Sequence, residues 1–474
     1  PAVSAERALL VTEYYQSEAA RGRSPALQRA RAFDYILTHK AIWIGEEELI
    51  VGERGPLPKA TPTYPEVCLH TLEDLKILDR RERTPYRVDD ATRSAYAQKI
   101  IPFWQGRTMR QRIFDHMHAD WCAAYDAGMF TEFQEQRSPG HTVLGGRLFG
   151  EGFEDILKHI AQARDGLDFA DAPQALDKLE ELQAMAICAE AIIGWVQRYA
   201  EALESEAGQC ADAARRAELE HMAAICRKVP ARAPETFWEA LQHYWFIHVG
   251  VITELNPWDA FNPGRLDQHL YPFYQRDIAS GRLTSEQARE LLQAFWIKFN
   301  NHPAPPKTGV TAKESNTYVD FALINTGGVT ADNEDAVNEL SYLILDVVEE
   351  MRLLQPSAMV QISKKTPERF LQRALKIVRT GFGQPSIFNT DAIVQELVRQ
   401  GKSVEDARQG GASGCVEAGA FGREAYFRTG YFNLCKVLEV TLNNGIDPQS
   451  GRRIGIETGD PLSFADFDAL YSAF

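Results

Sequence analysis

The sequence predicts an α/β protein in which helices and short strands alternate. Three observations lead to this prediction. Helical and strand-like stretches alternate over residues 333–401, and this alternation ends in a glycine-rich segment at 410–419. Hydrophobic residues make up 45% and charged residues 25% of the 474 positions, as in ordinary globular proteins. Alternation of this kind favours a parallel sheet or barrel, whose functional sites gather at the carboxyl ends of the strands.

The first half of the chain is predicted to be mainly helical. Over residues 6–113, apolar-periodic stretches alternate with turn-rich segments, which predicts short helices between loops. Residues 173–207 and 210–228 carry apolar positions at four- and three-residue spacing, which predicts two long packed helices. We therefore expect a mainly helical part at 1–230 that packs on a sheet or barrel part at 231–474, within a single large domain.

Start and stop signals order the elements of the last third. Apolar stripes with a period of 3.6 mark the helices, and proline or glycine marks their ends. The predicted elements are a helix over 333–354, a strand over 357–363, a helix from Thr366-Pro367 to about Gly381, a strand over 385–388, and a helix from Asn389 or Thr390 to about Gly401, after which Ser403 opens one more turn.

Charge and composition exclude several classes of function. The formal net charge of -15 argues against a nucleic-acid partner, because such proteins gather lysine and arginine on one face. The chain has neither an apolar run of about 18 residues nor the layout of a secretory signal, so we expect a cytoplasmic protein that does not span a membrane. The seven cysteines are scattered without a Cys-x-x-Cys pair, which predicts reduced thiols and no metal site.

The segment at 410–419 is the strongest candidate for a functional site. It contains four glycines within ten residues, and these let the backbone approach another backbone or a ligand closely. Cys415 lies among them, at the expected tip of a loop. If 415–417 is locally extended, the Cys415 thiol and the Glu417 carboxylate point to the same side, because residues two apart in a strand share a face.

Three interpretations of this cysteine compete. A tight turn with a buried cysteine acting as a small apolar residue is the ordinary one. A phosphate loop lacks its Gly-Lys-Ser/Thr signature here. A nucleophilic cysteine needs a cation or a histidine base to lower its pKa, whereas the nearest charged neighbour is Glu417. A carboxylate raises the pKa of a nearby thiol and keeps it protonated, which favours hydrogen-atom chemistry over ionic attack.

The string Gly414-Cys415-Val416-Glu417 resembles the thiyl-radical motif of the glycyl radical enzymes. The longer string over 420–426 is similar to the branch of that family that dehydrates hydroxyproline. The resemblance covers essentially the whole chain, with motifs in the family order. These further motifs lie at 48–53, 131–133, 139–142, 253–256, 258–261, 263–267, 298–301 and 429–431.

This resemblance implies an α/β barrel of ten strands wrapped in helices, incomplete at its carboxyl end in this chain. It implies removal of water from trans-4-hydroxy-L-proline to give a pyrroline carboxylate, with no bound cofactor. The radical would lie on a carboxyl-terminal glycine and be installed by an S-adenosylmethionine-dependent iron-sulfur activating enzyme. A homodimer and an anaerobic cytoplasm are further expectations of the family.

The resemblance also implies roles for eight residues. Cys415 would carry the thiyl radical, Glu417 would be the adjacent acid or base, and Asp259 with His141 would contact the substrate hydroxyl. Ser315 would bind the substrate carboxylate, and Phe133, Phe321 and Tyr431 would line the pocket. Each has an ordinary structural explanation as well: the phenylalanines as core, Asp259 and Ser315 as loop caps, and His141 as a structural histidine after Pro-Gly.

Two departures from the family pattern leave alternatives open. The radical loop Arg-Val-x-Gly-Tyr is not in the sequence, and Arg428-Thr429-Gly430-Tyr431 is one residue short of it. The chain ends at Phe474 inside a predicted helix, so we expect a carboxyl-terminal portion to be missing. Phe427 and Arg428 stand where two apolar residues are expected in the dehydratase branch. The alternatives are C–N cleavage of hydroxyproline, decarboxylation of an arylacetate, and an inactive homologue that serves as a scaffold.

Overall fold

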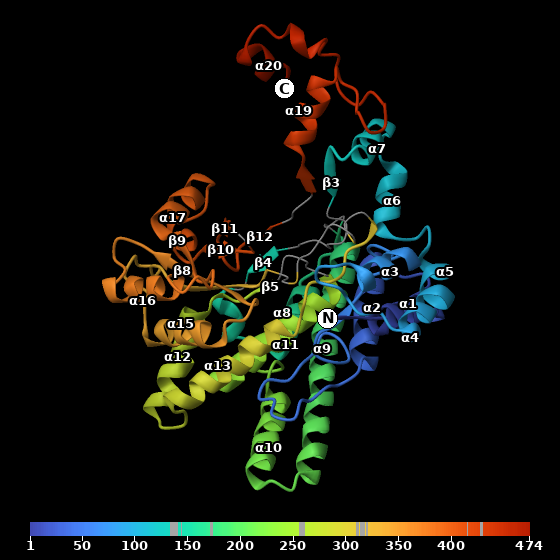
Figure 1. Cartoon of the computed structure of the whole chain (residues 1–474). Coiled ribbons are helices and arrows are strands. Elements are labelled where there is room, and N and C mark those ends of the chain that lie inside the picture. The colour runs from blue at the N-terminus through green and yellow to red at the C-terminus, as the bar shows by residue number, and fades with distance from the viewer. Residues whose placement is uncertain are drawn as a thin grey trace.

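A computed structural model gives the arrangement of the chain in space (Figure 1). It describes residues 1–132, 141–143, 145–170, 174–255, 261–309, 312, 318, 321–414, 416–426 and 430–474. At 132, 141–143 and 426 only the backbone is described.

The amino-terminal part consists of short helices between loops, as predicted. Strand β1 pairs in parallel with β2 and ties the amino terminus to this part. The elements are β1 (Ala2–Ser4), α1 (Glu6–Gln16), η1 (Glu18–Ala20), α2 (Pro25–His39), β2 (Ala60–Pro62), α3 (Leu72–Arg80), α4 (Asp90–Ala95), η2 (Tyr96–Ile100), α5 (Ile101–Trp104), α6 (Met109–His116), α7 (Ala119–Asp126) and β3 (Phe130–Glu132).

The middle of the chain supplies the main core. Helices α9 and α10 are the two long packed helices that the spacing predicted, and their far ends project from the body (Figure 1). Helix α11 is buried on nearly every side, as expected of a helix that is apolar all round. The elements are β4 (His141–Val143), η3 (Gly146–Phe149), α8 (Phe153–Asp165), α9 (Ala175–Gln209), α10 (Ala213–Lys228), α11 (Phe237–Leu255), β5 (Phe261–Asn262), β6 (Gly264–Arg265), α12 (Leu266–Ala279) and α13 (Ser285–Asn300).

The largest hydrophobic cluster joins both halves of the chain. Phe33 of α2 and Trp195 of α9 belong to the same cluster as Trp245 of α11, Phe295 of α13 and Ile344 of the last third. Burying such large side chains contributes about 1.5–3 kcal/mol each. The helices that bear them are therefore fixed against one another beside the sheet.

The last third alternates between strands and helices, which confirms the predicted α/β class. The elements are β7 (Leu323–Gly327), α15 (Glu339–Met351), β8 (Ser357–Ile362), α16 (Glu368–Val378), β9 (Ser386–Asn389), α17 (Thr390–Arg399), α18 (Val404–Arg408), β10 (Gly411–Ser413), β11 (Glu417–Gly419), β12 (Ala425–Tyr426), β13 (Gly430–Phe432), α19 (Leu434–Leu442), η4 (Pro461–Ser463) and α20 (Phe467–Ala473).

The helix predicted over 333–354 begins later than expected. Its first residue is Glu339, because the side chain of Asn338 accepts a hydrogen bond from the backbone of Ser341 and caps it there. Asn333 instead adopts a positive φ of 66°, which takes it out of the helical region. The helices predicted to begin at Thr366 and at Asn389 or Thr390 begin within two residues of those positions, at Glu368 and Thr390.

Two mainly parallel ladders meet in a bend at Pro263. Strands β6, β7, β8 and β9 pair in that order, all parallel. Strand β5, one residue before β6, pairs in parallel with β4, and β4 pairs antiparallel with β12. Proline lacks the N–H that a ladder needs, so the strand changes partner there. Among the described residues these two ladders contain three and four strands, seven together, and they do not close into a barrel.

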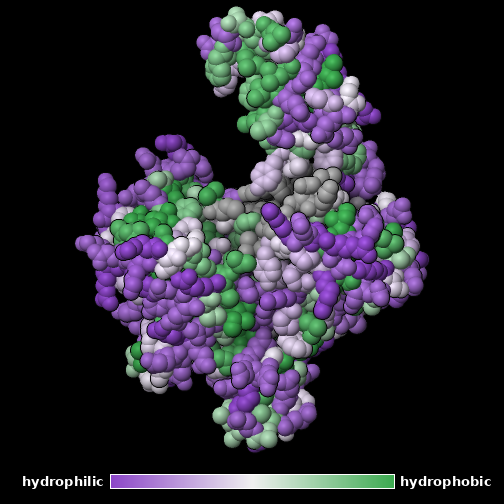
Figure 2. Space-filling model, viewed as in Figure 1, coloured by the Kyte–Doolittle hydropathy of each residue, from purple (hydrophilic) through white to green (hydrophobic). Residues whose placement is uncertain are grey.

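The segment from β13 to α20 forms an arm that stands away from the body (Figure 1). Strand β13 pairs antiparallel with β3, which fixes the base of the arm. Apolar side chains on the arm are exposed, and Figure 2 shows them gathered on its surface. Among the described residues, no helix is both long enough and apolar enough to cross a bilayer.

Candidate functional site

The glycine-rich segment forms a β-hairpin. Strands β10 and β11 pair antiparallel, with Ser413 opposite Glu417. Gly414 and Val416 lie in the turn between them, and Gly414 adopts a positive φ of 55° that glycine tolerates without strain. Cys415, between them in the sequence, lies outside the described residues.

Strand β10 is buried, whereas the turn is open on one side. Residues 410–414 are all buried, but the side chain of Val416 is 68% exposed. The backbone of Ala412 contacts Asn325 in the middle of β7. The hairpin therefore lies against the buried face of the parallel sheet rather than on the outer surface.

Glu417 begins β11, immediately after the turn. Its side chain is half-buried, and its Oε2 accepts a hydrogen bond from the backbone N–H of Val416 at 3.0 Å. The carboxylate is therefore directed back toward the turn.

Of the two residues that the resemblance assigns to the substrate hydroxyl, only the backbone of His141 is described. His141 is the first residue of β4, where its backbone pairs with Tyr426 of β12. On its other side β4 pairs with β5, which begins at Phe261, two residues after Asp259. The side chain of His141 and the whole of Asp259 lie outside the described residues.

Phe133 and Ser315 lie outside the described residues, but described residues that precede each of them in the sequence line one cavity. The cavity has a volume of about 410 Å³, and Thr131 and Gly309 are both among its lining residues. Thr131 lies two residues before Phe133, and Gly309 six residues before Ser315. Thr131 and Gly309 therefore lie at the same cavity.

The two remaining candidates occupy different environments. Phe321 adopts a positive φ of 63°, uncommon for a bulky residue, and packs against buried Ala304. Tyr431 belongs to β13, opposite Thr131 of β3, and its side chain is 55% exposed. In the described structure, Phe321 is thus half-buried beside the 301–309 segment, whereas Tyr431 lies at the base of the arm.

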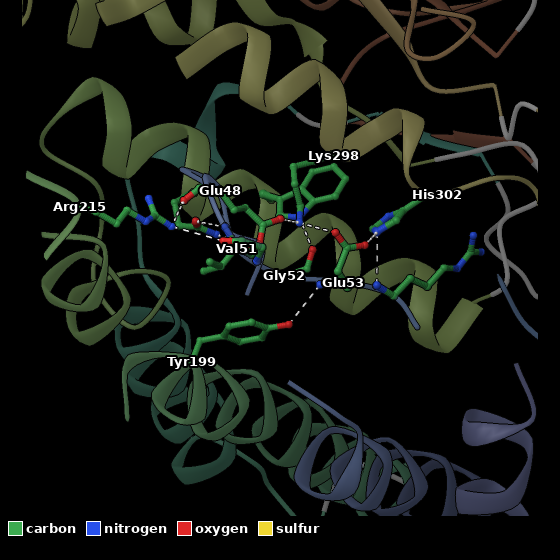
Figure 3. A network of polar contacts seen from close by, with 12 residues as sticks. Glu48, Val51, Gly52, Glu53, Tyr199, Arg215, Lys298 and His302 are labelled. Atoms are coloured by element: carbon green, nitrogen blue, oxygen red, sulfur yellow. Dashed lines mark hydrogen bonds and ion pairs between the residues drawn. The ribbon is translucent and has the colours of Figure 1, made fainter. Parts of the chain in front are cut away.

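A buried charge network joins two sequence motifs that lie far apart in the chain (Figure 3). The ammonium group of Lys298, in the last turn of α13, forms ion pairs with Glu48 and Glu53. The Nε2 of His302 lies 2.8 Å from the second carboxylate oxygen of Glu53 and donates to it. The side chains of Lys298, Glu53 and His302 are each at most 2% exposed.

Burial and pairing act in opposite directions on these groups. Burial alone would raise the pKa of Glu53, but Lys298 and His302 outweigh it and lower that pKa to about 2. Burial alone would lower the pKa of Lys298, but Glu53 and Glu48 raise it above its ordinary value. Burial lowers the pKa of His302 to about 4, so this histidine is neutral near pH 7. The network fixes the start of the 301–309 segment.

Sequence reasoning missed the polar side chains that support the site. Lys298 interrupts an apolar stretch, Phe295-Trp296-Ile297-Lys298-Phe299, and Asn325 directly follows the apolar residues Leu323 and Ile324. A polar residue inside an apolar run was the available signal, because such a residue is buried only with a partner. The identity of the partner depends on the tertiary fold. Among the described residues, no group of three His, Cys, Asp or Glu side chains is placed to hold a metal.

Comparison with known proteins extends this picture. The family model described as pyruvate formate lyase-like matches residues 1–474. The chain is 52% identical to trans-4-hydroxy-L-proline dehydratase from Clostridioides difficile and 30% identical to isethionate sulfite-lyase from Oleidesulfovibrio alaskensis. Each match includes the whole of this chain, which spans 60% and 58% of the length of these two relatives.

A solved structure agrees with the fold. The crystal structure of hydroxyproline dehydratase from Clostridioides difficile, with trans-4-hydroxy-L-proline bound, superimposes with a TM-score of 0.96 at 52% identity. The superposition covers all of this chain and 60% of the other. The α/β arrangement described above is thus that of a solved enzyme.

Proposed function

Because the chain belongs to the pyruvate formate lyase-like family, we propose that it is part of a glycyl radical dehydratase that removes water from trans-4-hydroxy-L-proline. Membership of the family confirms the resemblance found in the motifs. The observation that carries the proposal is the difference in identity between relatives. Identity is 52% to the hydroxyproline dehydratase but 30% to a family member that is named for another substrate.

The proposal includes the larger architecture. The bent sheet, in the order β12, β4, β5 with β6, β7, β8, β9, would be one part of a ten-stranded barrel. The hairpin that bears position 415 lies on its inner side, held by β7. A barrel interior excludes water, which protects a radical and strengthens every charge interaction inside.

Cys415 is the residue that exchanges a hydrogen atom with the substrate in this proposal. The family's glycyl radical supplies one piece of chemistry, which is removal of the hydrogen atom from a cysteine sulfur. The described hairpin fits this use, because the exposed side chain of Val416 leaves one side of the turn open to a second segment. Cys415 would then take a hydrogen atom from the substrate ring carbon next to nitrogen.

The remaining steps use acids and bases of this chain. Glu417 accepts the proton of the substrate nitrogen, and the C–O bond on the neighbouring carbon breaks. Asp259, oriented with His141, donates a proton so that the hydroxyl leaves as water. Cys415 then returns its hydrogen atom to the carbon that lost the hydroxyl, which leaves 1-pyrroline-5-carboxylate and restores the thiyl state. Ser315 would bind the substrate carboxylate, with Phe133, Phe321 and Tyr431 around the ring.

The proposal has a direct test. The full-length protein, activated without oxygen by its activating enzyme, is incubated with trans-4-hydroxy-L-proline, and products are identified by mass spectrometry. We expect 1-pyrroline-5-carboxylate. A ring-opened amino acid would indicate C–N cleavage, and turnover of an arylacetate would indicate a decarboxylase. A protein that holds a glycine-centred radical by electron paramagnetic resonance but turns over none of these substrates would contradict the proposal.

Variants separate the roles of the two hairpin residues. Cys415→Ser should abolish turnover, because a hydroxyl O–H bond is too strong for this exchange, and should leave the fold unchanged by circular dichroism. Glu417→Gln should bind substrate without converting it. Cys435→Ser is the matched control, because Cys435 is exposed on α19. It should turn over at the wild-type rate.

The proposed partners follow from the same family membership. They are the small-molecule substrate, a separate iron-sulfur activating enzyme that uses S-adenosylmethionine, and a second copy of the chain in a homodimer. The proposed setting is an anaerobic cytoplasm. Size-exclusion chromatography with light scattering tests the dimer. Radical yield with and without the activating enzyme tests the second partner.

A further inference from the structure

We infer that Arg265, Asn325 and Gln361 form a clamp that positions the hairpin of β10 and β11. These three residues come from β6, β7 and β8, three strands that are adjacent in the sheet. They hold the backbone that leads into the turn at position 415. The catalytic part of this inference rests on the function proposed above, whereas its structural part does not.

Asn325 forms two hydrogen bonds with the backbone of one residue of β10. Its Nδ2 donates to the carbonyl oxygen of Ala412 at 2.9 Å, and the N–H of Ala412 donates to its Oδ1 at 3.2 Å. Both residues are fully buried. A side-chain amide that pairs with both the N–H and the C=O of one residue holds the two peptide groups on either side of that residue.

Gln361 holds the carbonyl group two residues earlier. Its Nε2 donates to the oxygen of Gly410 at 3.1 Å and to Oδ1 of Asn325 at 3.2 Å. The second bond links the two amides and sets the direction of each. Gln361 is 1% exposed, so water does not compete for these contacts.

Arg265 holds the carbonyl group of Arg408, two residues before Gly410. Its Nη1 donates to the oxygen of Arg408 at 2.9 Å, while Nη2 donates to the oxygen of Gly327 at 2.6 Å. The carbonyls of residues 408, 410 and 412 are thus held by three different strands.

The packing leaves no room for displacement at the centre of the clamp. A Cβ atom built on Gly411 would lie 2.3 Å from Oδ1 of Asn325 and 2.4 Å from Nε2 of Gln361. The backbone therefore touches the clamp at van der Waals distance, and glycine is needed at this position. The hydrogen bonds and the close packing together fix the depth of the hairpin over the sheet.

This depth bears directly on hydrogen-atom transfer. The reacting atoms must come within about 3–3.5 Å, and a misplacement of 1 Å costs on the order of 100-fold in rate. The turn begins two residues beyond Ala412. The clamp, which holds the backbone of residues 408–412, therefore consists of positioning residues for the thiol that do not contact the substrate.

The structural test measures exchange of backbone amides in the protein before activation. Asn325→Leu removes both contacts at similar volume, Asn325→Asp keeps the acceptor for the N–H of Ala412, and Gln361→Met removes the amide. Hydrogen–deuterium exchange, resolved to single amides, should show protection of the Ala412 N–H falling at least tenfold in Asn325→Leu and less in Asn325→Asp. The alkylation rate of Cys415 by iodoacetamide should change in the same order.

Gln355→Met is the matched control. Gln355 is also 1% exposed, and its Nε2 also donates to two backbone carbonyls, those of Phe299 and His302. It lies before β8, at the end of the strand opposite Gln361. Its loss should leave the exchange of Ala412 and the alkylation of Cys415 unchanged. Unchanged protection of Ala412 in both Asn325 variants, or an equal effect of Gln355→Met, would overturn the clamp.

The catalytic test uses the activated full-length protein. In Gln361→Met and Asn325→Asp, kcat for trans-4-hydroxy-L-proline should fall 10- to 100-fold, while KM changes less than about threefold and the radical yield stays at the wild-type level. A purely structural role would lower radical yield and kcat together and would contradict the positioning role. If the activated wild-type protein did not turn over the substrate, that result would contradict the proposed function and not the clamp. Hydrogen–deuterium exchange at Ala412 would still test whether the clamp holds the hairpin.

Discussion

Glu53 shows how one buried carboxylate can organise distant parts of the chain. It receives Lys298 from the end of α13 on one oxygen and His302 from the following loop on the other. Its own position lies between α2 and β2, in a segment without regular secondary structure. Charge pairing therefore replaces a ladder or a helix as the force that fixes this segment against the core.

Replacing Glu53 with glutamine should destabilise the protein strongly. The pKa of Glu53 is about 2, so the carboxylate is charged at pH 7, and its loss leaves Lys298 in the interior with Glu48 as its remaining partner. Breaking a buried pair in this way costs about 3–5 kcal/mol. Urea denaturation at pH 7 measures the change in the free energy of unfolding.

Glu204→Gln, which breaks an exposed pair with Arg227, is the control and should leave that free energy nearly unchanged. Equal effects of the two variants would contradict the role given to the network.

At the level of single residues, the glycines around Cys415 and the neighbouring Glu417 were visible as a local pattern that predicted a loop. The structure has a β-hairpin there, with Val416 in the turn and Glu417 at the start of β11, and the role of Cys415 stays a prediction. Asn325 and Gln361 carry no local signal beyond being polar in a buried strand. Their contacts join residues 87 and 49 positions apart, and no periodicity encodes such a separation.

The short strand β10 illustrates how an element is held without a long ladder. It has three residues and pairs with β11 alone, so its position comes from side chains of the sheet beneath it. Isolated two-stranded hairpins are marginal in water. The close approach of Gly411 to that sheet is therefore part of what stabilises the element.

Gly411→Ala should destabilise the protein by overpacking. The added methyl group would lie within 2.7 Å of Asn325, Gln361 and Phe421, and the buried amides have no room to withdraw. Overpacking of this kind costs about 1–3 kcal/mol. Gly194→Ala is the control, because a Cβ there meets no atom within 4 Å and α9 gains a better helix former. Thermal unfolding should show a lower Tm for the first variant and an equal or higher Tm for the second. The opposite order would show that β10 is free to move.

At the level of elements, hydrophobic periodicity and capping signals were enough to predict the long helices. α9, α10, α16 and α17 lie close to their predicted bounds, because each presents an apolar stripe and a recognisable start or stop signal. Strands β4, β5, β6 and β12 have two or three residues each, too few for an alternating pattern to appear. Their pairing depends on tertiary contacts around the bend at Pro263, which composition does not reveal.

At the scale of the whole molecule, His243, His248 and His302 are buried beside the hydrophobic cluster that joins both halves of the chain. His243 and His248 lie on α11, and His302 follows α13. Burial lowers the pKa of His243 and of His302 to about 4, and it lowers that of His248 well below its ordinary value. A hydrogen bond from His243 to the carbonyl of Leu148 opposes this shift without cancelling it. The folded protein therefore keeps these side chains neutral in mildly acidic solution.

This arrangement predicts loss of stability as the pH falls from about 6.5 to about 4. In that window the unfolded chain binds a proton at each histidine and the folded chain does not, so the stabilisation that is complete above pH 6.5 is progressively lost. Each such histidine contributes up to about 1.4 kcal/mol per pH unit. The free energy of unfolding in urea, measured between pH 7 and pH 4.5, should fall less steeply in His243→Gln than in the wild type. His159→Gln, at an exposed position on α8, should follow the wild-type slope. Parallel curves for wild type and His243→Gln would show that His243 is protonated equally in the folded and unfolded states.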